Sequence, residues 1–245
     1  MPARCSSRIG FMHIPKTAGL SVADAFVREL GTDKCAVFSN EINDEIFRNK
    51  RFVSGHIYLG DINCDAFLFT FLRDPIKQIA SHLMWIDHYN LPEFQHEMVG
   101  FTEDIQTCIR RLAHTDLSSG KSIDEYLTWL PIDSELRVIN VQSEMLAFKR
   151  NDVVTLTDNE LSSRAIQHLH KLDFFGINDN LTEDMRTLFR LLEFDSEPIV
   201  RRLNRSPCTR YVDHQSFSVR RVLAKHVAAD QRLYDHALEL KAKRS

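Results

Sequence analysis

The 245-residue sequence has few features of a disulfide-stabilised, zinc-bound or membrane-spanning protein. Its five cysteines are odd in number and scattered, and no two of them form a CxxC pair. This pattern argues against a disulfide framework or a structural zinc site and favours a reducing compartment. No apolar run approaches the roughly 18 to 20 residues that span a bilayer, and the N-terminus shows no apolar segment of a signal peptide. The sequence therefore predicts a soluble, cytoplasmic protein without stable membrane insertion.

Glycine and net charge are also scarce. The chain has eight glycines and shows no repeat, low-complexity tract or linker, so a single domain over residues 1–245 is expected. A net charge of −3 gives no general attraction to nucleic acid or membranes. The charge is uneven, however, because the segment from Val200 to Lys225 holds seven Arg or Lys residues and only one acidic residue, Asp213. This basic stretch is either a solvated face or a contact region for an anionic ligand.

Short apolar runs near the N-terminus alternate with helical patterns, and helical patterns dominate later. The strands are expected at 9–14, 35–38, 52–57, 66–72 and 172–177. The helices are expected at 19–30, after Asp74-Pro75, at 103–114, 123–129, 135–148, from the capping box Thr157–Glu160 towards Leu172, at 182–194 and at 219–240. The run AFLFTFL at 66–72 is typical of a strand buried on both faces of a parallel sheet. The sequence predicts an α/β fold, P-loop-like and three-layered, with a central parallel sheet flanked by helices.

The first strand-to-helix turn carries Lys16, Thr17, Gly19 and Ser21. Backbone N–H groups at a helix N-terminus are unpaired and partly positive, so they favour a phosphate there. Gly19 permits a close approach of the backbone, and Lys16 supplies a positive charge for a leaving oxygen. The alternative is a tight connection with an ordinary surface lysine.

This turn nearly matches a nucleotide P-loop. Gly10 and Lys16-Thr17 have the GxxxxGK[ST] spacing, but Pro15 stands where the second glycine belongs. Gly10 also falls inside the apolar run rather than in the loop. Hydrolysis of ATP or GTP is therefore disfavoured.

A second anion-binding pattern follows the AFLFTFL run. Arg73 lies at the expected carboxyl end of this strand, and Ser81 follows two turns into the next helix. An arginine and a serine so placed can bind one phosphate by charge-assisted hydrogen bonds. The alternative is that Arg73 forms an ion pair with Asp74 or with a neighbouring helix.

The two segments HIPKTAGLS (13–21) and FLRDPIKQIASHL (71–83) together resemble the binding elements for 3′-phosphoadenosine-5′-phosphosulfate (PAPS) of the carbohydrate sulfotransferases. The likeness is closest to the heparan sulfate 2-O- and 6-O-sulfotransferase type and its bacterial relatives. In that family the first element is the 5′-phosphosulfate loop and the second binds the 3′-phosphate. Residues 140–147 (NVQSEMLA) and 203–206 (LNRS) resemble a segment after the central helices and the loop that closes over the nucleotide. The resemblance implies PAPS-binding roles for Lys16, Thr17, Ala18, Gly19, Leu20, Ser21, Arg73, Ser81, Asn204, Arg205 and Ser206.

The catalytic base is expected at His56. The 2-O-sulfotransferases carry a glycine–histidine–apolar segment similar to 53–59 (VSGHIYL), and by that resemblance His56 is the base. An ordinary imidazole titrates near 6.5 and accepts a hydroxyl proton at neutral pH. Lys16 is the second catalytic residue expected, because it would stabilise charge on the departing phosphate. His13 also fits the family pattern, but its place inside the first apolar run favours a structural role.

The sequence thus predicts a metal-free transfer of a sulfuryl group from PAPS to a hydroxyl. By the resemblance alone, the acceptor is a glycan or glycolipid; a small alcohol, a phenol or a peptide tyrosine stays open, as does the oligomeric state. His168 and His170 do not share a helix face, so no metal site is expected there. Two alternatives remain: a small P-loop kinase or NTPase that binds ATP with Mg²⁺, and a non-catalytic sulfotransferase-like module that binds nucleotide or glycan.

Overall fold

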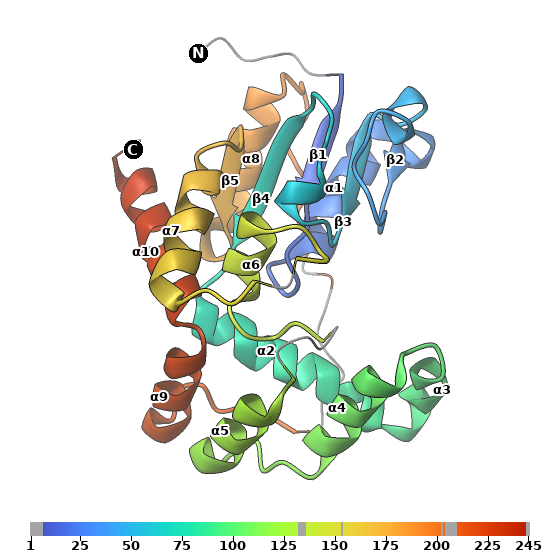
Figure 1. The fold of residues 1–245 in the computed structure, drawn as a ribbon. Helices are drawn as coiled ribbons and strands as arrows, with labels where there is room; N and C mark the ends of the chain where they lie inside the picture. Colours follow the sequence, from blue (N-terminus) through green and yellow to red (C-terminus); the bar gives the residue numbers. More distant parts are fainter. Residues whose placement is uncertain (1–6, 132–135, 153, 202, 204–209, 244–245) are drawn as a thin grey trace. The chain divides into compact units, whose positions relative to one another are not determined.

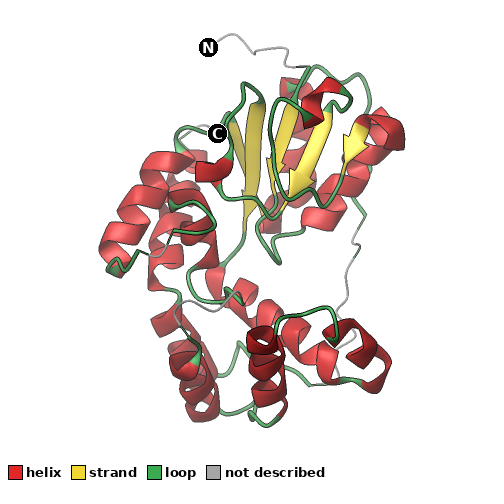
Figure 2. Cartoon of the chain, turned by 45° about the vertical axis from the view of Figure 1, so that its right-hand side comes forward, coloured by secondary structure: helices red, strands yellow, loops and turns green. Residues whose placement is uncertain are grey.

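The computed structural model describes residues 7–131, 136–152, 154–201, 203 and 210–243, and these residues form two compact units. The first, which we call the sheet unit, comprises Met1–Arg73, Gln142–Asn204 and Leu233–Ser245. The second, the helical unit, comprises Asp74–Val141 and Arg205–Arg232. Figure 2 shows all the strands in the first unit and only helices and loops in the second. That the chain is one sulfotransferase domain stays a prediction.

The sheet unit is built around a five-stranded, wholly parallel sheet of order β2-β3-β1-β4-β5. The strands are β1 (Ile9–Met12), β2 (Cys35–Ala36), β3 (Phe52–Gly55), β4 (Phe67–Leu72) and β5 (Phe174–Ile177). The chain fills one side of β1 with β2 and β3 before it crosses to β4 on the other side. Parallel α/β sheets bind ligands at the carboxyl ends of the strands beside such a crossover.

Helices cover both faces of this sheet, which confirms the expected three-layer α/β fold (Figure 1). One face packs on α1 (Gly19–Leu30) and α8 (Leu181–Leu191), and α6 (Val141–Ala147) and α7 (Asp158–Leu169) lie on the other. Phenylalanine rings fill the first interface: Phe26 of α1 stacks on Phe52 with ring centroids 4.3 Å apart, and Phe11 stacks on Phe69 at 4.8 Å. Stacked aromatic rings bury large apolar areas, so this interface stabilises the sheet.

The helical unit contains α2 (Pro75–Asp87), α3 (Gln95–Met98), α4 (Glu103–Ala113), α5 (Gly120–Trp129) and α9 (Phe217–His226), and α10 (Ala228–Ala242) runs from this unit into the sheet unit. Short 3₁₀ turns occupy 32–34, 46–48, 59–61, 88–90, 92–94 and 178–180. The predicted start of α2 is confirmed: Pro75 takes the first turn, and the Asp74 carboxylate accepts from the Lys77 amide at 2.9 Å. Leu83, Ile123 and Leu223 are fully buried between α2, α5 and α9.

The helix expected over 135–148 begins only at Val141. Asn140 has a left-handed backbone (φ 49°), which ends any helical path before α6. Its side-chain oxygen instead accepts from the amides of Ala229 and Asp230, at 3.1 and 3.2 Å, near the first turn of α10. The prediction failed here because a distant helix start takes up the Asn140 side chain.

The single helix expected over 219–240 is two helices. Val227, at φ −124° and ψ 31°, leaves the helical region and separates α9 from α10. The amphipathic pattern continues across this break, so periodicity alone did not reveal it. In the ranges described above, no helix, these two included, has the length and apolarity to cross a membrane.

Candidate active site

The parallel register of β1 and β3 brings His13 and His56 together. Met12 pairs with Gly55, and the amide of His13 donates to the carbonyl of Gly55 at 2.9 Å. A histidine directly follows each strand, and the two imidazoles meet edge to face with ring centroids 4.6 Å apart. Because β1 ends at Met12, His13 lies just beyond the strand and at the same edge as the expected base.

Both imidazoles are held in the neutral form. Burial lowers the pKa of His13 to about 3, helped by its neighbours His56 and Lys16. The pKa of His56 is lowered to about 4, first by the protein packed around its ring and then by the positive charges of Arg150 and Lys16. His56 keeps solvent access all the same, because its residue surface is exposed. A neutral, accessible imidazole is the form that accepts a proton at neutral pH.

The loop between β1 and α1 has an unusual backbone. Lys16 and Ala18 adopt left-handed conformations (φ 66° and 78°), although neither is glycine. Such conformations cost on the order of 1–3 kcal/mol each and persist where surrounding contacts enforce them. One such contact is internal: the hydroxyl of fully buried Thr17 donates to the carbonyl of Ile14 at 2.9 Å. This buried hydrogen bond of Thr17 therefore stabilises the conformation of the loop.

The N-terminus of α1 lacks a side-chain cap and has no acidic residue in its first turn. Helices α2, α4, α5 and α7 are by contrast capped by Asp74, Thr102, Ser119 and Thr157. In the first turn of α1, Leu20 is partly buried, and the buried Ser21 hydroxyl accepts from the Leu203 amide at 3.3 Å. Amides of an uncapped helix start attract anions, so this end of α1 suits a phosphate.

Two glycines near the loop have packing roles. A Cβ added to Gly19 would lie 1.8 Å from the imidazole of His13, so the ring occupies the space that a side chain at Gly19 would need. A Cβ on Gly10 would lie 2.7 Å from the Leu68 side chain, within the sheet. Gly10 therefore belongs to β1 and its packing, as the sequence indicated, and it does not shape the loop.

The Lys16 loop and Arg73 meet at the carboxyl edge of the sheet. Arg73 directly follows β4, and its Nη1 donates to the carbonyl of Lys16 at 2.9 Å. Ser81 is placed in the helical unit, partly buried in α2. The predicted lid residues Asn204, Arg205 and Ser206 lie outside the described residues.

Sequence reasoning gave no role to two residues that touch this site. The buried side chain of Gln142, at the start of α6, accepts from the Arg73 amide and donates to the Arg73 carbonyl, both at 3.0 Å. The guanidinium of Arg150 donates to the carbonyl of His56. Gln142 falls in the segment 140–147 that resembles the sulfotransferases, whereas nothing in the sequence marked Arg150.

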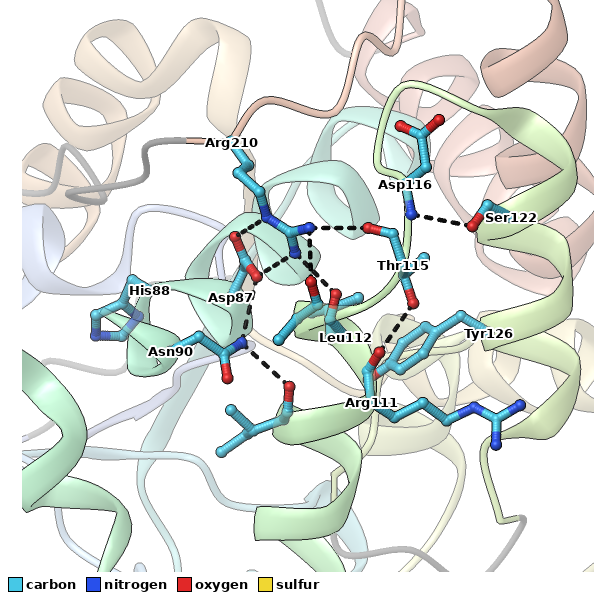
Figure 3. A network of polar contacts seen from close by, with 12 residues as sticks. Asp87, His88, Asn90, Arg111, Leu112, Thr115, Asp116, Ser122, Tyr126 and Arg210 are labelled. Carbon is cyan, nitrogen blue, oxygen red and sulfur yellow. Dashed lines mark hydrogen bonds and ion pairs between the residues drawn. The ribbon is translucent and has the colours of Figure 1, made fainter. Parts of the chain in front are cut away.

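The basic stretch near the C-terminus is in part structural. Arg210 of the helical unit forms an ion pair with the buried carboxylate of Asp87, with Nε 2.9 Å from Oδ2 (Figure 3). The same guanidinium donates to the carbonyls of Leu112, Ala113 and Thr115, at 2.8, 3.1 and 2.9 Å. Lys225 pairs with Asp124 at 3.0 Å. These two cations stabilise the helical unit, so they are weaker candidates for ligand contacts.

Among the residues that the structure describes, no group of three or more His, Cys, Asp or Glu side chains is arranged to hold a metal ion. No protein-family model matches the sequence, and no curated protein gives a significant match. The arrangement of Lys16, His56 and Arg73 at one edge of the sheet is therefore the basis on which a function is assigned.

Proposed function

We propose that the chain is a PAPS-dependent sulfotransferase that transfers a sulfuryl group to a hydroxyl. The observation that carries the proposal is the hydrogen bond of 2.9 Å between the Arg73 guanidinium and the Lys16 carbonyl. PAPS carries a phosphosulfate and a phosphate on one ribose, and a ligand of this kind needs two cationic elements close together. The Lys16 loop and Arg73 meet that requirement within the sheet unit.

In the proposed reaction the acceptor oxygen attacks the sulfur of PAPS while the bond from sulfur to the 5′-phosphate oxygen breaks. The imidazole of His56 takes the hydroxyl proton. Lys16 and the amides at the uncapped start of α1 stabilise the negative charge that collects on the departing phosphate. The transferred group carries less charge than a phosphoryl group, so these donors suffice in our proposal without a metal ion.

The surroundings of His56 suit a base whose proton affinity increases when anionic PAPS binds beside it. With a pKa of about 4 the free imidazole is neutral at pH 7 but only weakly basic. Burial is the main cause of this low pKa, and an anionic co-substrate beside Lys16 would offset only the smaller contribution of the Lys16 charge. Through this charge, binding of PAPS would raise the pKa of His56 part of the way and make the ring a better proton acceptor.

The finer parts of the proposal rest on the sequence. We propose a glycan or glycolipid hydroxyl as acceptor because of the resemblance to carbohydrate sulfotransferases, and a cytoplasmic location because of the scattered cysteines. The rival nucleotide hydrolase is disfavoured because Gly10 packs inside β1 instead of lining a phosphate loop.

A binding and turnover experiment tests the proposal. Adenosine 3′,5′-bisphosphate (PAP), the desulfated product, should raise the melting temperature more than ATP with Mg²⁺ does, and [³⁵S]PAPS should label a member of an acceptor panel. His56→Ala should lower turnover by about 10²- to 10⁴-fold and Lys16→Ala by about 10²- to 10³-fold. The exposed residues His96 and Lys121 provide matched alanine controls that should stay near wild type. Turnover unchanged in both site variants would refute the assignment, and a preference for ATP with Mg²⁺ would favour the kinase reading.

A further inference from the structure

We propose that Gln142 is a positioning residue, which holds Arg73 so that the Arg73 guanidinium fixes the shape of the Lys16 loop. This inference rests on the proposed function, because it gives Gln142 a part in PAPS binding without any contact to PAPS. All three residues belong to the sheet unit.

Gln142 holds the backbone of Arg73 on both sides. Its Oε1 accepts from the Arg73 amide and its Nε2 donates to the Arg73 carbonyl, each at 3.0 Å. The side chain is only 1% exposed, so water does not compete for these bonds. Two hydrogen bonds to one residue fix the direction in which its side chain leaves the backbone. The end of β4 is thus held in one orientation by α6.

Arg73 passes this constraint to the loop. Its Nη1 donates to the carbonyl of Lys16, the residue whose backbone is left-handed at φ 66°. A left-handed non-glycine residue persists only when its surroundings enforce the conformation. The contact fixes the carbonyl of Lys16 and therefore the peptide that precedes Thr17. Contacts thus run without a gap from α6 through Arg73 to the loop proposed to bind the phosphosulfate.

The opposite end of β4 offers a control in which an exposed side chain makes one bond to the strand. There the Asp173 carboxylate accepts from the Leu68 amide at 2.8 Å, and the Asp173 amide donates to the Leu68 carbonyl at 2.9 Å. Asp173 therefore also holds one end of β4, but at the amino edge of the sheet, away from the Lys16 loop. A purely structural role for Gln142 predicts that its loss lowers overall stability without a local effect on the Lys16 loop, as the loss of the exposed Asp173 side chain would. A positioning role predicts that only Gln142 affects the loop and the nucleotide.

The first experiment compares Gln142→Met, which removes both bonds at nearly constant volume, with Asp173→Ala. We expect hydrogen exchange of the peptide covering residues 13–21 to accelerate in Gln142→Met only. PAP should bind about tenfold less tightly, because its binding would then have to order the Arg73 side chain and the Lys16 loop. The KM for PAPS should rise by a similar factor, with a smaller change in kcat. Should Gln142→Met fail to fold, Gln142→Asn keeps a neutral amide on a shorter side chain and should show a smaller loss.

The second experiment asks whether Gln142 acts through Arg73. In an Arg73→Lys background, Gln142→Met should add little further loss of PAP affinity, whereas Asp173→Ala should add to Arg73→Lys as it does in the wild type. Additive losses for Gln142→Met, or equal loop exchange in the two single variants, would overturn the inference. If the wild type binds no PAP, the proposed function fails instead, and loop exchange alone still decides whether Gln142 positions the loop.

Discussion

Arg73 and Arg210 both donate to backbone carbonyls, yet they serve different regions. Arg210 pairs with the buried carboxylate of Asp87 and also holds three carbonyls around the end of α4, all within the helical unit. Arg73 bonds to a carbonyl of the strained Lys16 loop at the carboxyl edge of the sheet. The partner thus distinguishes the two residues: Arg210 neutralises a buried charge, whereas Arg73 binds the backbone of the loop proposed to hold the phosphosulfate.

The largest expected effect tests this difference directly. Arg210→Met leaves the Asp87 carboxylate buried without its only ion-pair partner among the described residues, and we expect it to lower the free energy of unfolding by about 3 kcal/mol. Arg73→Met should cost less stability but abolish detectable PAP binding. Chemical unfolding measures the free energy of unfolding of both variants, and calorimetric titration measures their affinity for PAP. The comparison breaks if Arg210→Met, under conditions where it is folded, loses PAP binding as completely as Arg73→Met does.

A second, smaller effect concerns the packing of His13 on α1. Gly19→Ala places a Cβ 1.8 Å from the His13 ring, so either the ring or the start of α1 must move. Overpacking of this kind costs about 1–3 kcal/mol, and here it should also lower PAP affinity. Gly100→Ala is the control, because its Cβ would meet an ordinary contact at 3.6 Å. Equal melting temperatures for the two variants would show that His13 is not held by Gly19.

The smallest expected effect is on the protonation of His56. Arg150→Gln removes one of the charges that lower the pKa of His56, so that pKa should rise from about 4 towards its ordinary value. Lys149→Gln removes a neighbouring charge that is not among the causes of the shift and serves as the control. Proton NMR titration of the histidine ring signals measures the pKa of His56 in each of the two variants. A pKa of His56 that does not move in Arg150→Gln would contradict the electrostatic contact.

The lowered pKa values of His13 and His56 also decide whether the protein becomes more or less stable in acid. Below about pH 6.5 the unfolded chain binds protons at His13 and His56, whereas the folded chain binds them only near pH 3 and 4. The unfolded state therefore gains protons first, and these two residues make stability fall as the pH drops from about 6.5 towards 4. His13→Phe should weaken this dependence, whereas the exposed control His96→Phe should not.

Most strands and helices of the sheet unit follow from local sequence. The expected helix over 19–30 matches α1, and the buried run at 66–72 gives β4 within one residue. Their patterns are strong because one element is amphipathic and the other is apolar throughout. Asn140 of the helical unit shows where local sequence is not sufficient. Its backbone is left-handed, and its side chain accepts a hydrogen bond from the start of α10, 89 residues later in the sequence.

The sequence also singled out the residues to which we assign the proposed chemistry, but not the residues that contact them. Lys16, His56 and Arg73 stand next to recognisable strand ends, so their shared edge could be predicted from a parallel sheet. Gln142 is 69 residues from Arg73, and Arg150 is 94 residues from His56. No local pattern records such long-range contacts.

By itself the sequence determined the parallel α/β architecture and the types of residue at the carboxyl edge, because apolar periodicity and motif spacing are local properties. Only the tertiary structure decided that His13 lies against His56, that Arg73 holds the Lys16 loop and that Arg210 is bound to Asp87. Those outcomes depend on strand register and on which distant donors and acceptors meet. The physical reason is that buried polar groups must find partners, and folding brings those partners from remote parts of the chain.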